Sequence, residues 1–257
     1  GMLMAFIIPP GVSFLIPILG AVMAVYIGKH LLGGLGYNIF NPALLGRAFL
    51  LATFPVAMTS AWLPPLTDGV FFTYFSGGID AITTATPLAV MKEQGMAVFR
   101  ETFGSPATVY PTFFLGLRPG SIGETSGLLI LLGGLYLMYR RYITWHIPVS
   151  VLGSIAVLTW IFGGETLFSG DPLLAVLTGG ALLGAFYMAT DYVTSPSTRT
   201  AQLVYGAGIG ALTVLIRLKG GYPEGICYAI LLMNPLSTVL DGWFKPKRFA
   251  APLGGEK

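Results

Sequence analysis

Long apolar runs recur along almost the whole chain, and each is about as long as a lipid bilayer is thick. A helix needs roughly 20 mostly apolar residues to cross the hydrocarbon core, with a range of about 17–25. Candidate spans lie near 12–29, 41–57, 126–140, 147–163, 172–190, 202–218 and 225–242. Because lipid offers no hydrogen bonds, a spanning run must satisfy its own backbone polar groups, as a helix does. The runs therefore predict an all-α fold, a polytopic transmembrane helical bundle, with residues 1–257 forming one transmembrane domain.

The scarcity of charge excludes a water-soluble globular protein of this length. Charged residues make up 10% of the 257 positions, hydrophobic residues make up 54%, and the mean hydropathy is +0.76. A soluble domain carries about 25% charged residues, so lipid must replace water over much of the surface. The 35 glycines and 18 prolines then indicate close helix packing and broken helices. Residues 1–8 resemble the tail of another span, and we expect the chain to be N-terminally incomplete.

Cysteine and histidine are too few for most metal-based redox centres. Cys227 is the one cysteine, so an internal disulfide and an all-cysteine iron–sulfur site are excluded. His30 and His146 lie far apart and do not favour a bis-histidine haem. An electron carrier of this composition would use an organic cofactor. The pI near 9 does not indicate a nucleic-acid partner, because the basic residues cluster beside apolar runs instead of alternating with aromatic residues.

Residues 58–125 differ from the rest of the chain, since they are too polar to face lipid. Loops beyond about 12–15 residues are usually functional, so we expect a long loop outside the membrane. Residues 87–102 predict a short amphipathic helix that lies along the interface. The charged residues of the segment are Asp68, Asp80, Lys92, Glu93, Arg100, Glu101, Arg118 and Glu124.

The basic residues predict the orientation of the bundle. If the spans alternate in direction, most Lys and Arg residues between spans fall on one side, which the positive-inside rule identifies as cytoplasmic. The C-terminus then lies in the cytoplasm, and residues 58–125 face outward, to the periplasm or the exterior. The residues that place the cytoplasmic side are Lys29, Arg140, Arg141, Arg199, Lys245, Lys247 and Arg248.

Two proline-containing turns suggest an internal repeat. Asn41 to Ala43 opens one span, and Ser195 to Ser197 comes just before another, both on the predicted cytoplasmic side. Corresponding breaks of this kind are typical of inverted repeats with a site at their interface. Proline is also common at the first turn of any helix, so both interpretations stay open.

The segment from Gly77 to Leu88 contains the most distinctive motif, with Thr83, Thr84 and Thr86 before Pro87. Thr86 has the features of an N-cap, with Pro87 at the first helical position. It can be a cap alone. A helix N-terminus also favours phosphate, so a phosphoryl group esterified to Thr86 is the alternative.

Other polar and aromatic residues have two interpretations each. Arg47 lies inside a span and is a functional candidate, although it can also extend to the cytoplasmic surface. Asp191 and Arg199 flank a turn that either lines an ion or flavin site or is a solvated loop. Asp241 is expected to be a cap or an ion-pair partner. Tyr110, Trp145, Trp243 and Trp62 fit interfacial aromatic belts, with flavin stacking as the alternative for Trp62.

Five ordered motifs resemble those of the RnfD/NqrB family. They are Gly33 to Ala43 (GGLGYNIFNPA), Phe54 to Trp62 (FPVAMTSAW), Asp80 to Leu88 (DAITTATPL), Asp191 to Pro196 (DYVTSP) and Gly221 to Gly225 (GYPEG), followed by Asn234 to Leu236 and Asp241. The matches run from about residue 30 to 241, and the compact outer loop and Pro87 favour RnfD. One departure is Thr84, where the family commonly has glycine.

The resemblance implies a membrane subunit of an Rnf or Nqr complex, which couples electron transfer to export of Na⁺ or H⁺. It implies FMN attached through its phosphate to Thr86 by a separate flavin transferase, an FMN-bearing external subunit as a partner, and riboflavin as a further cofactor to consider. The chain would act as part of an Rnf-type ferredoxin:NAD⁺ oxidoreductase and not alone. The cofactor-binding candidates are Thr86, Asp80, Thr83, Thr84, Ala85, Asn41, Arg47, Trp62, Asp191 and Ser195.

The expected function is an electron relay between an outward-facing redox domain of a partner and the membrane interior. The flavin would carry the redox chemistry and the protein would position it. Two alternatives remain at this stage: a channel or secondary transporter without a redox cofactor, and a structural subunit that holds redox partners together.

Overall fold

Polar caps and prolines mark the beginning of several helices. Asn41, Thr86 and Asp171 each accept a hydrogen bond from a backbone N–H of the first helical turn, and each precedes a proline. Proline is favoured there because its missing N–H would have no helical partner and its φ angle is already helical. The computed structural model describes residues 1–31, 33–34, 36–62, 86–116, 119–164, 166–222 and 224–244.

The described residues are helical and contain no strand, which confirms the all-α prediction. The helices are α1 (Met2–Ile7), α2 (Leu15–Val22), π-helical η1 (Met23–His30), α3 (Pro42–Thr53), α4 (Pro55–Ser60), α5 (Pro87–Glu93), α6 (Gly95–Phe103), α7 (Pro106–Leu115), α8 (Gly127–Tyr139), α9 (His146–Phe162), α10 (Pro172–Leu177), α11 (Ala181–Leu183), π-helical η2 (Gly184–Met188), α12 (Arg199–Lys219), α13 (Ile226–Met233) and α14 (Leu236–Trp243).

Among these helices, α12 alone is long and apolar enough to cross a bilayer uninterrupted. Helices α13 and α14 pass the same criterion as a pair, but they are bent by 52° where they meet. Shorter apolar helices cover Leu15–His30, Pro42–Thr53, Gly127–Tyr139 and His146–Phe162. The polytopic bundle and the inverted repeat thus stay predictions.

Three predicted spans are broken, as the abundance of glycine and proline indicates. The run 41–57 divides into α3 and α4 at Phe54, whose φ and ψ are −127° and 59°. The run 172–190 divides at Thr178, which is extended, and at Gly179, whose φ is +61°. The run 225–242 bends at Asn234 and Pro235. Proline removes a helical hydrogen bond, and glycine alone adopts positive φ without strain.

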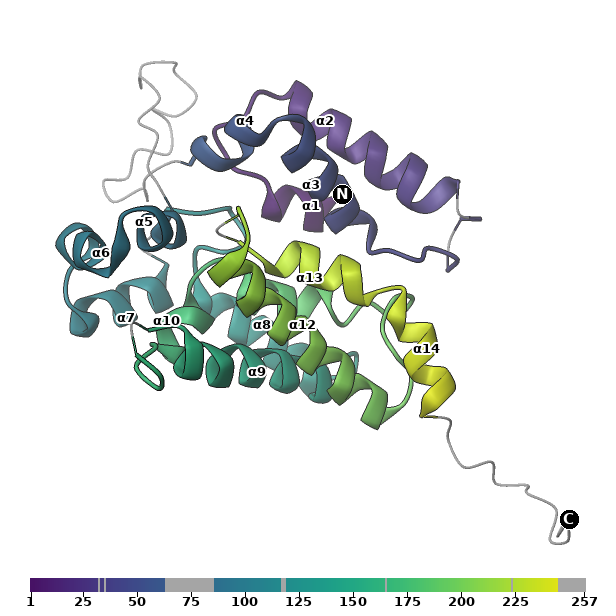
Figure 1. The fold of residues 1–257 in the computed structure, drawn as a ribbon. Helices are drawn as coiled ribbons and strands as arrows, with labels where there is room; N and C mark the ends of the chain where they lie inside the picture. The colour runs from purple at the N-terminus through teal and green to yellow at the C-terminus, as the bar shows by residue number, and fades with distance from the viewer. Residues whose placement is uncertain are drawn as a thin grey trace, which may run out of the picture.

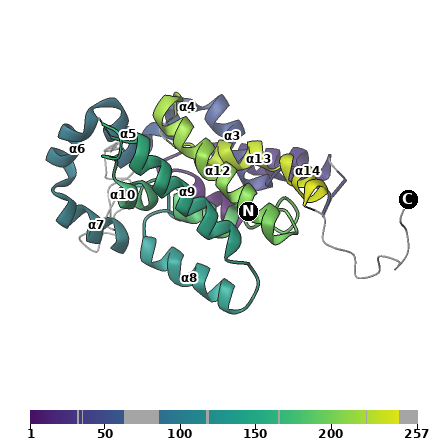
Figure 2. The same cartoon turned by 60° about the horizontal axis from the view of Figure 1, so that its bottom comes forward.

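The predicted helix 87–102 is also divided. Helix α5 ends at Glu93, and α6 begins at Gly95, which has a φ of +85°. Helices α5, α6 and α7 gather at one end of the molecule, and α14 lies at the other end (Figures 1 and 2).

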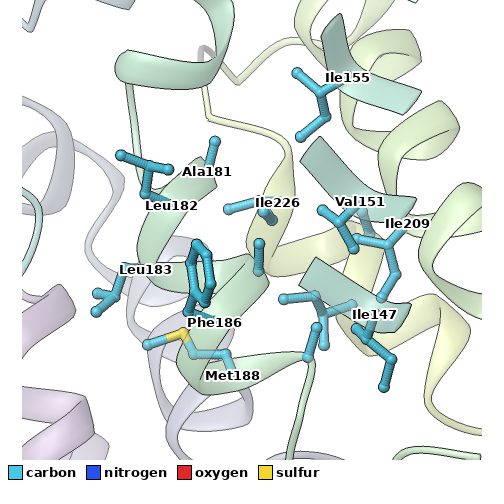
Figure 3. Packing of buried hydrophobic residues seen from close by; sticks show 14 of the residues in the cluster. Ile147, Val151, Ile155, Ala181, Leu182, Leu183, Phe186, Met188, Ile209 and Ile226 are labelled. Atoms are coloured by element: carbon cyan, nitrogen blue, oxygen red, sulfur yellow. The ribbon is translucent and has the colours of Figure 1, made fainter. Parts of the chain in front are cut away.

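The main core lies between α9 and α12 and the broken segment from α10 to η2. Ile147, Val151 and Ile155 of α9 face Ile209 of α12, with Phe186 of η2 nearby (Figure 3). The two long helices approach closely, and a Cβ added at Gly210 would lie 2.8 Å from the carbonyl oxygen of Val151. A second core joins α1, α2 and α3 through residues that include Met4 and Leu50. The second core also includes Met58 of α4, and it holds in place two of the helices, α3 and α4, that line the cavity described next.

Candidate functional site

Thr86 caps α5, as its sequence context predicts. Its backbone is extended, and its Oγ1 accepts a hydrogen bond of 3.2 Å from the backbone N–H of Ala89. Pro87 occupies the first helical position. The residue is 7% exposed, which is low for a threonine at the beginning of a short helix. Its burial indicates that other elements pack around the cap.

Thr86 lies in the wall of a cavity of about 480 Å³. The wall includes residues of α3, α4, α5 and the turn between α12 and α13, elements that are far apart in the sequence. Its described lining residues are Arg47, Leu51, Pro55, Met58, Thr59, Ser60, Trp62, Thr86, Ala89, Glu93, Gly221, Tyr222 and Glu224. Ligand pockets typically measure about 300–1,000 Å³ and are mostly apolar with a few polar groups. The size and the lining both fit an organic cofactor.

Arg47 is buried in this wall, so the expectation that it extends to the cytoplasmic surface is wrong. It is 4% exposed. Its Nη1 donates to Glu124 Oε1 at 3.3 Å, and its Nη2 donates to Glu224 Oε2. A buried charge needs a partner to offset the loss of hydration, and here two carboxylates fix the guanidinium in place.

Sequence reasoning missed the role of Glu124 and Glu224 as partners of Arg47. They lie 77 and 177 residues away from it, and no local pattern joins such positions. A signal was nevertheless present, because an arginine inside an apolar run requires an acid nearby and the whole chain has only 11 acidic residues.

The break between α10 and α11 packs against two charged side chains from other segments, Arg217 and Glu124. Arg217 of α12 donates to the carbonyl oxygens of Ala175 (2.7 Å) and Thr178 (3.0 Å), which the broken helix leaves without helical partners. A Cβ added at Gly180 would lie 2.8 Å from Glu124 Oε1. Glycine at this position therefore lets the carboxylate that pairs with Arg47 approach the backbone.

Lys92 fixes α5 to the turn after α12. Its Nζ donates to the carbonyl oxygen of Tyr222 at 2.9 Å and also to that of Gly220. Partial burial lowers the pKa of this ammonium group, and the nearby Glu93 carboxylate opposes the shift. The contact joins two walls of the cavity, the one with Thr86 and the one with Tyr222.

Trp62 is 3% exposed and lines the cavity, so its assignment to an interfacial aromatic belt is wrong. Trp145 and Trp243 are exposed, as a belt requires. Tyr110 donates to Asp171, the residue that caps α10, and this hydrogen bond raises the pKa of Tyr110 to about 12.

Asn41, Asp191 and Ser195 do not belong to the described lining of the cavity. Asn41 caps α3 and donates from Nδ2 to the carbonyl oxygen of Met188 at 3.2 Å. Asp191 accepts from the Thr194 hydroxyl at 3.1 Å, and burial raises the pKa of its carboxyl group.

Asp241 bonds to the backbone that leads into α12, although it does not cap the first turn of that helix. Its Oδ1 and Oδ2 accept from the backbone N–H of Ser197 at 3.0 and 3.1 Å, just before α12 begins. Together with Asn41 and Asp191, it forms what we call the capping end of the molecule.

The structure thus brings Thr86, Arg47 and Trp62 together in one cavity and places Asn41, Asp191 and Ser195 elsewhere. Asp80, Thr83, Thr84 and Ala85, which were also predicted as site residues, lie outside the described residues.

Comparisons with known proteins agree with the sequence motifs. A model described as the "NQR2, RnfD, RnfE family" matches residues 1–250. The chain is 49% identical over 250 residues to the D subunit of the proton-translocating ferredoxin:NAD(+) oxidoreductase complex of Clostridium ljungdahlii, covering 97% of this chain and 72% of the relative. It is 43% identical over 249 residues to the D subunit of the Na(+)-translocating ferredoxin:NAD(+) oxidoreductase complex of Acetobacterium woodii. This match covers 96% of this chain and 70% of the relative. The D subunit of the ion-translocating oxidoreductase complex of Halorhodospira halophila is 37% identical over 278 residues, with coverage of 100% and 77%.

Proposed function

The chain belongs to the NQR2, RnfD, RnfE family, and from this premise we propose that it is an electron-transfer subunit of an ion-translocating ferredoxin:NAD⁺ oxidoreductase complex, with FMN joined as a phosphoester to Thr86. The names of its relatives support the membership of such a complex. The chain functions there with other subunits, including an external FMN-bearing subunit, and a flavin transferase attaches its own cofactor.

The single observation that carries the cofactor assignment is the position of Thr86 in the wall of the cavity. The oxygen of an ester keeps lone pairs, so Oγ1 can accept from the Ala89 N–H before and after a phosphate is attached. Attachment is therefore compatible with the cap that begins α5. The cavity supplies space beside Thr86 for the rest of the cofactor.

The residues of the cavity fit a flavin. Trp62 and Tyr222 supply aromatic surface, Leu51 and Met58 supply apolar surface, and Arg47 supplies a fixed positive charge. When bound, the flavin supplies the redox chemistry. The chain itself holds the tether through Thr86, keeps α5 in place through Lys92 and reduces the access of water. Electrons would pass between an outward-facing partner and the membrane interior.

Exposed apolar helices support a position within a membrane. On α8, Leu129, Leu132 and Leu135 are 68%, 55% and 53% exposed, and lipid is a solvent in which such a surface is stable. Helices α5 to α7 and α14 lie at opposite ends of the molecule (Figure 2). This arrangement supports a polytopic bundle in the bacterial inner membrane with α5 to α7 outside and the C-terminus in the cytoplasm.

The test is flavin fluorescence of the denatured protein on a gel, after expression in a host that has the transferase. The wild-type band should fluoresce and its intact mass should exceed that of the chain by one FMN less water, whereas Thr86→Val should abolish both. Thr59→Val is the matched control, because Thr59 lines the same cavity outside the motif. A wild-type band without fluorescence would favour the alternatives, a channel or transporter without a redox cofactor or a structural subunit.

A further inference from the structure

Two aromatic side chains from distant parts of the sequence line the cavity. Trp62 follows α4 and is almost fully buried, and Tyr222 lies in the turn between α12 and α13. The Tyr222 ring is 5.4 Å from the ring of Tyr228, with an angle of 30° between their planes, so Tyr222 is supported from behind. Aromatic and apolar surfaces of this kind bind planar ring systems by stacking and by exclusion of water.

The guanidinium of Arg47 adds donors to the same wall. A guanidinium carries five N–H donors, and the described residues accept from two of its nitrogens, Nη1 and Nη2. Nη1 and Nη2 carry two N–H groups each and donate one hydrogen bond each to these carboxylates. Arg47 therefore retains capacity to donate hydrogen bonds, and a ring that bears carbonyl oxygens or aromatic nitrogens can accept them.

The two glutamates keep this guanidinium at one position. Glu124 is 3% exposed and lies against the backbone at Gly180, and Glu224 lines the cavity beside Arg47. A charged donor fixed before the ligand arrives requires little reorganisation on binding. Glu124 and Glu224 thus affect the binding of a ligand indirectly, because they hold the guanidinium of Arg47 in place.

We propose that the cavity is a non-covalent binding site for a planar heteroaromatic ring with carbonyl groups, and that Arg47 is its positioning residue. The proposal rests on the proposed function only where it identifies this ring as the isoalloxazine of the flavin. The phosphoester then prevents loss of the cofactor, while Trp62, Tyr222 and Arg47 fix the ring.

A second consequence concerns the reduction potential of the ring. Arg47 offsets part of the charge of the Glu124 and Glu224 carboxylates, and its own positive charge favours binding of the reduced, more electron-rich form over the oxidised form. By thermodynamic linkage, this difference in affinity raises the potential. Removal of the charge should lower the potential.

The first experiment measures the binding of lumiflavin, a flavin ring without a phosphate, to the full-length chain in detergent. The chain carries Thr86→Val, so that no tether can form, and binding is followed by the quenching of lumiflavin fluorescence. We expect saturable binding, which Ala89→Phe should weaken at least about tenfold because the new ring fills the cavity. Ala97→Phe is the matched control, since Ala97 is exposed on α6, and it should leave the affinity unchanged.

The second experiment isolates the charge of Arg47. Arg47→Met alone leaves the buried Glu124 and the partly buried Glu224 without this partner and can prevent folding, so we compare two variants in the Thr86→Val background. One carries Glu124→Gln and Glu224→Gln, and the other adds Arg47→Met to these. The ratio of the oxidised to the reduced lumiflavin dissociation constants should fall about tenfold when Arg47→Met is added, which is about 30 mV for a two-electron couple. Arg47→Lys, which keeps the charge, should preserve most of the ratio.

The outcomes separate this proposal from the proposed function. If lumiflavin binds as described but the wild-type chain carries no covalent FMN, the ring site stands and the phosphoester is wrong. If the wild-type chain carries FMN but lumiflavin does not bind, or if Ala89→Phe and Ala97→Phe have equal effects, the ring does not occupy this cavity. An unchanged ratio on adding Arg47→Met would overturn the role of Arg47.

Discussion

Two ends of this molecule contain polar residues that resemble site residues in the sequence, and the structure uses them differently. At the cavity end, Arg47 is held by carboxylates from distant segments and lines a space of about 480 Å³ beside Thr86. At the capping end, the polar groups of Asn41 and Asp241 are bonded to the backbone where helices begin. A polar residue in an apolar chain is thus a site candidate when it lines a cavity, and capping does not exclude this, since Thr86 caps α5 and also lines the cavity.

The largest expected effect comes from removing the buried charge at the cavity end. Arg47→Met should lower the free energy of unfolding by about 3–5 kcal/mol, because it leaves the buried Glu124 and the partly buried Glu224 without this cation. Denaturant unfolding in detergent measures the change. The variant with Glu124→Gln and Glu224→Gln added should recover part of the loss, and a failure to recover any would mean that packing rather than charge explains the effect.

A smaller effect is expected at the capping end. Asp241→Ala should cost about 0.5–1.5 kcal/mol, the net contribution of a typical hydrogen bond, because Ser197 and Thr198 lose the carboxylate that accepts from their N–H groups. The same unfolding experiment measures it. The content of covalent flavin should not change in this variant. A loss of flavin would show that the capping end also contributes to the cofactor site.

The hydrogen bonds from Lys92 that join α5 to the turn after α12 should contribute less to stability. Lys92 is exposed, and contacts between exposed groups are weak. Lys92→Met should change the free energy of unfolding by less than about 1 kcal/mol. It should nevertheless lower the fluorescence anisotropy of the bound flavin, because the tether then moves more freely. Lys219→Met, at the end of α12, is the control, and equal anisotropy in both variants would contradict the role of Lys92.

A dependence on pH should distinguish Asp191. Burial raises the pKa of its carboxyl group in the folded chain, so the folded state binds more protons than the unfolded state as pH rises above the ordinary pKa of 3.8. Stability should therefore fall with rising pH across the interval between the unfolded and folded pKa values. Asp191→Asn should remove this part of the slope, as measured by unfolding at several pH values. A slope of the opposite sign would show that the carboxylate is stabilised by partners.

Local rules predicted the helices and the caps well. The all-α fold and the cap at Thr86 with Pro87 after it follow from residues that are close in the sequence. These features depend on interactions within one turn, and the sequence displays them directly.

The rest depends on contacts between distant segments. Nothing near Arg47 in the sequence identifies Glu124 or Glu224 as its partners, and the surface position expected for Arg47 and the belt position expected for Trp62 were both wrong for this reason. The break at Thr178 and Gly179 is compensated by Arg217 of another helix, so the apolar pattern of 172–190 does not reveal it.

The most direct measurement is mass spectrometry of proteolytic peptides from the full-length chain, expressed with its transferase. The peptide that contains Thr86 should carry the mass of one FMN less water, with fragment ions that place it on Thr86, and peptides with Thr59 or Ser195 should be unmodified. An unmodified Thr86 peptide, or FMN on a residue outside the cavity, would contradict the assignment of this cavity as the site of the covalent cofactor.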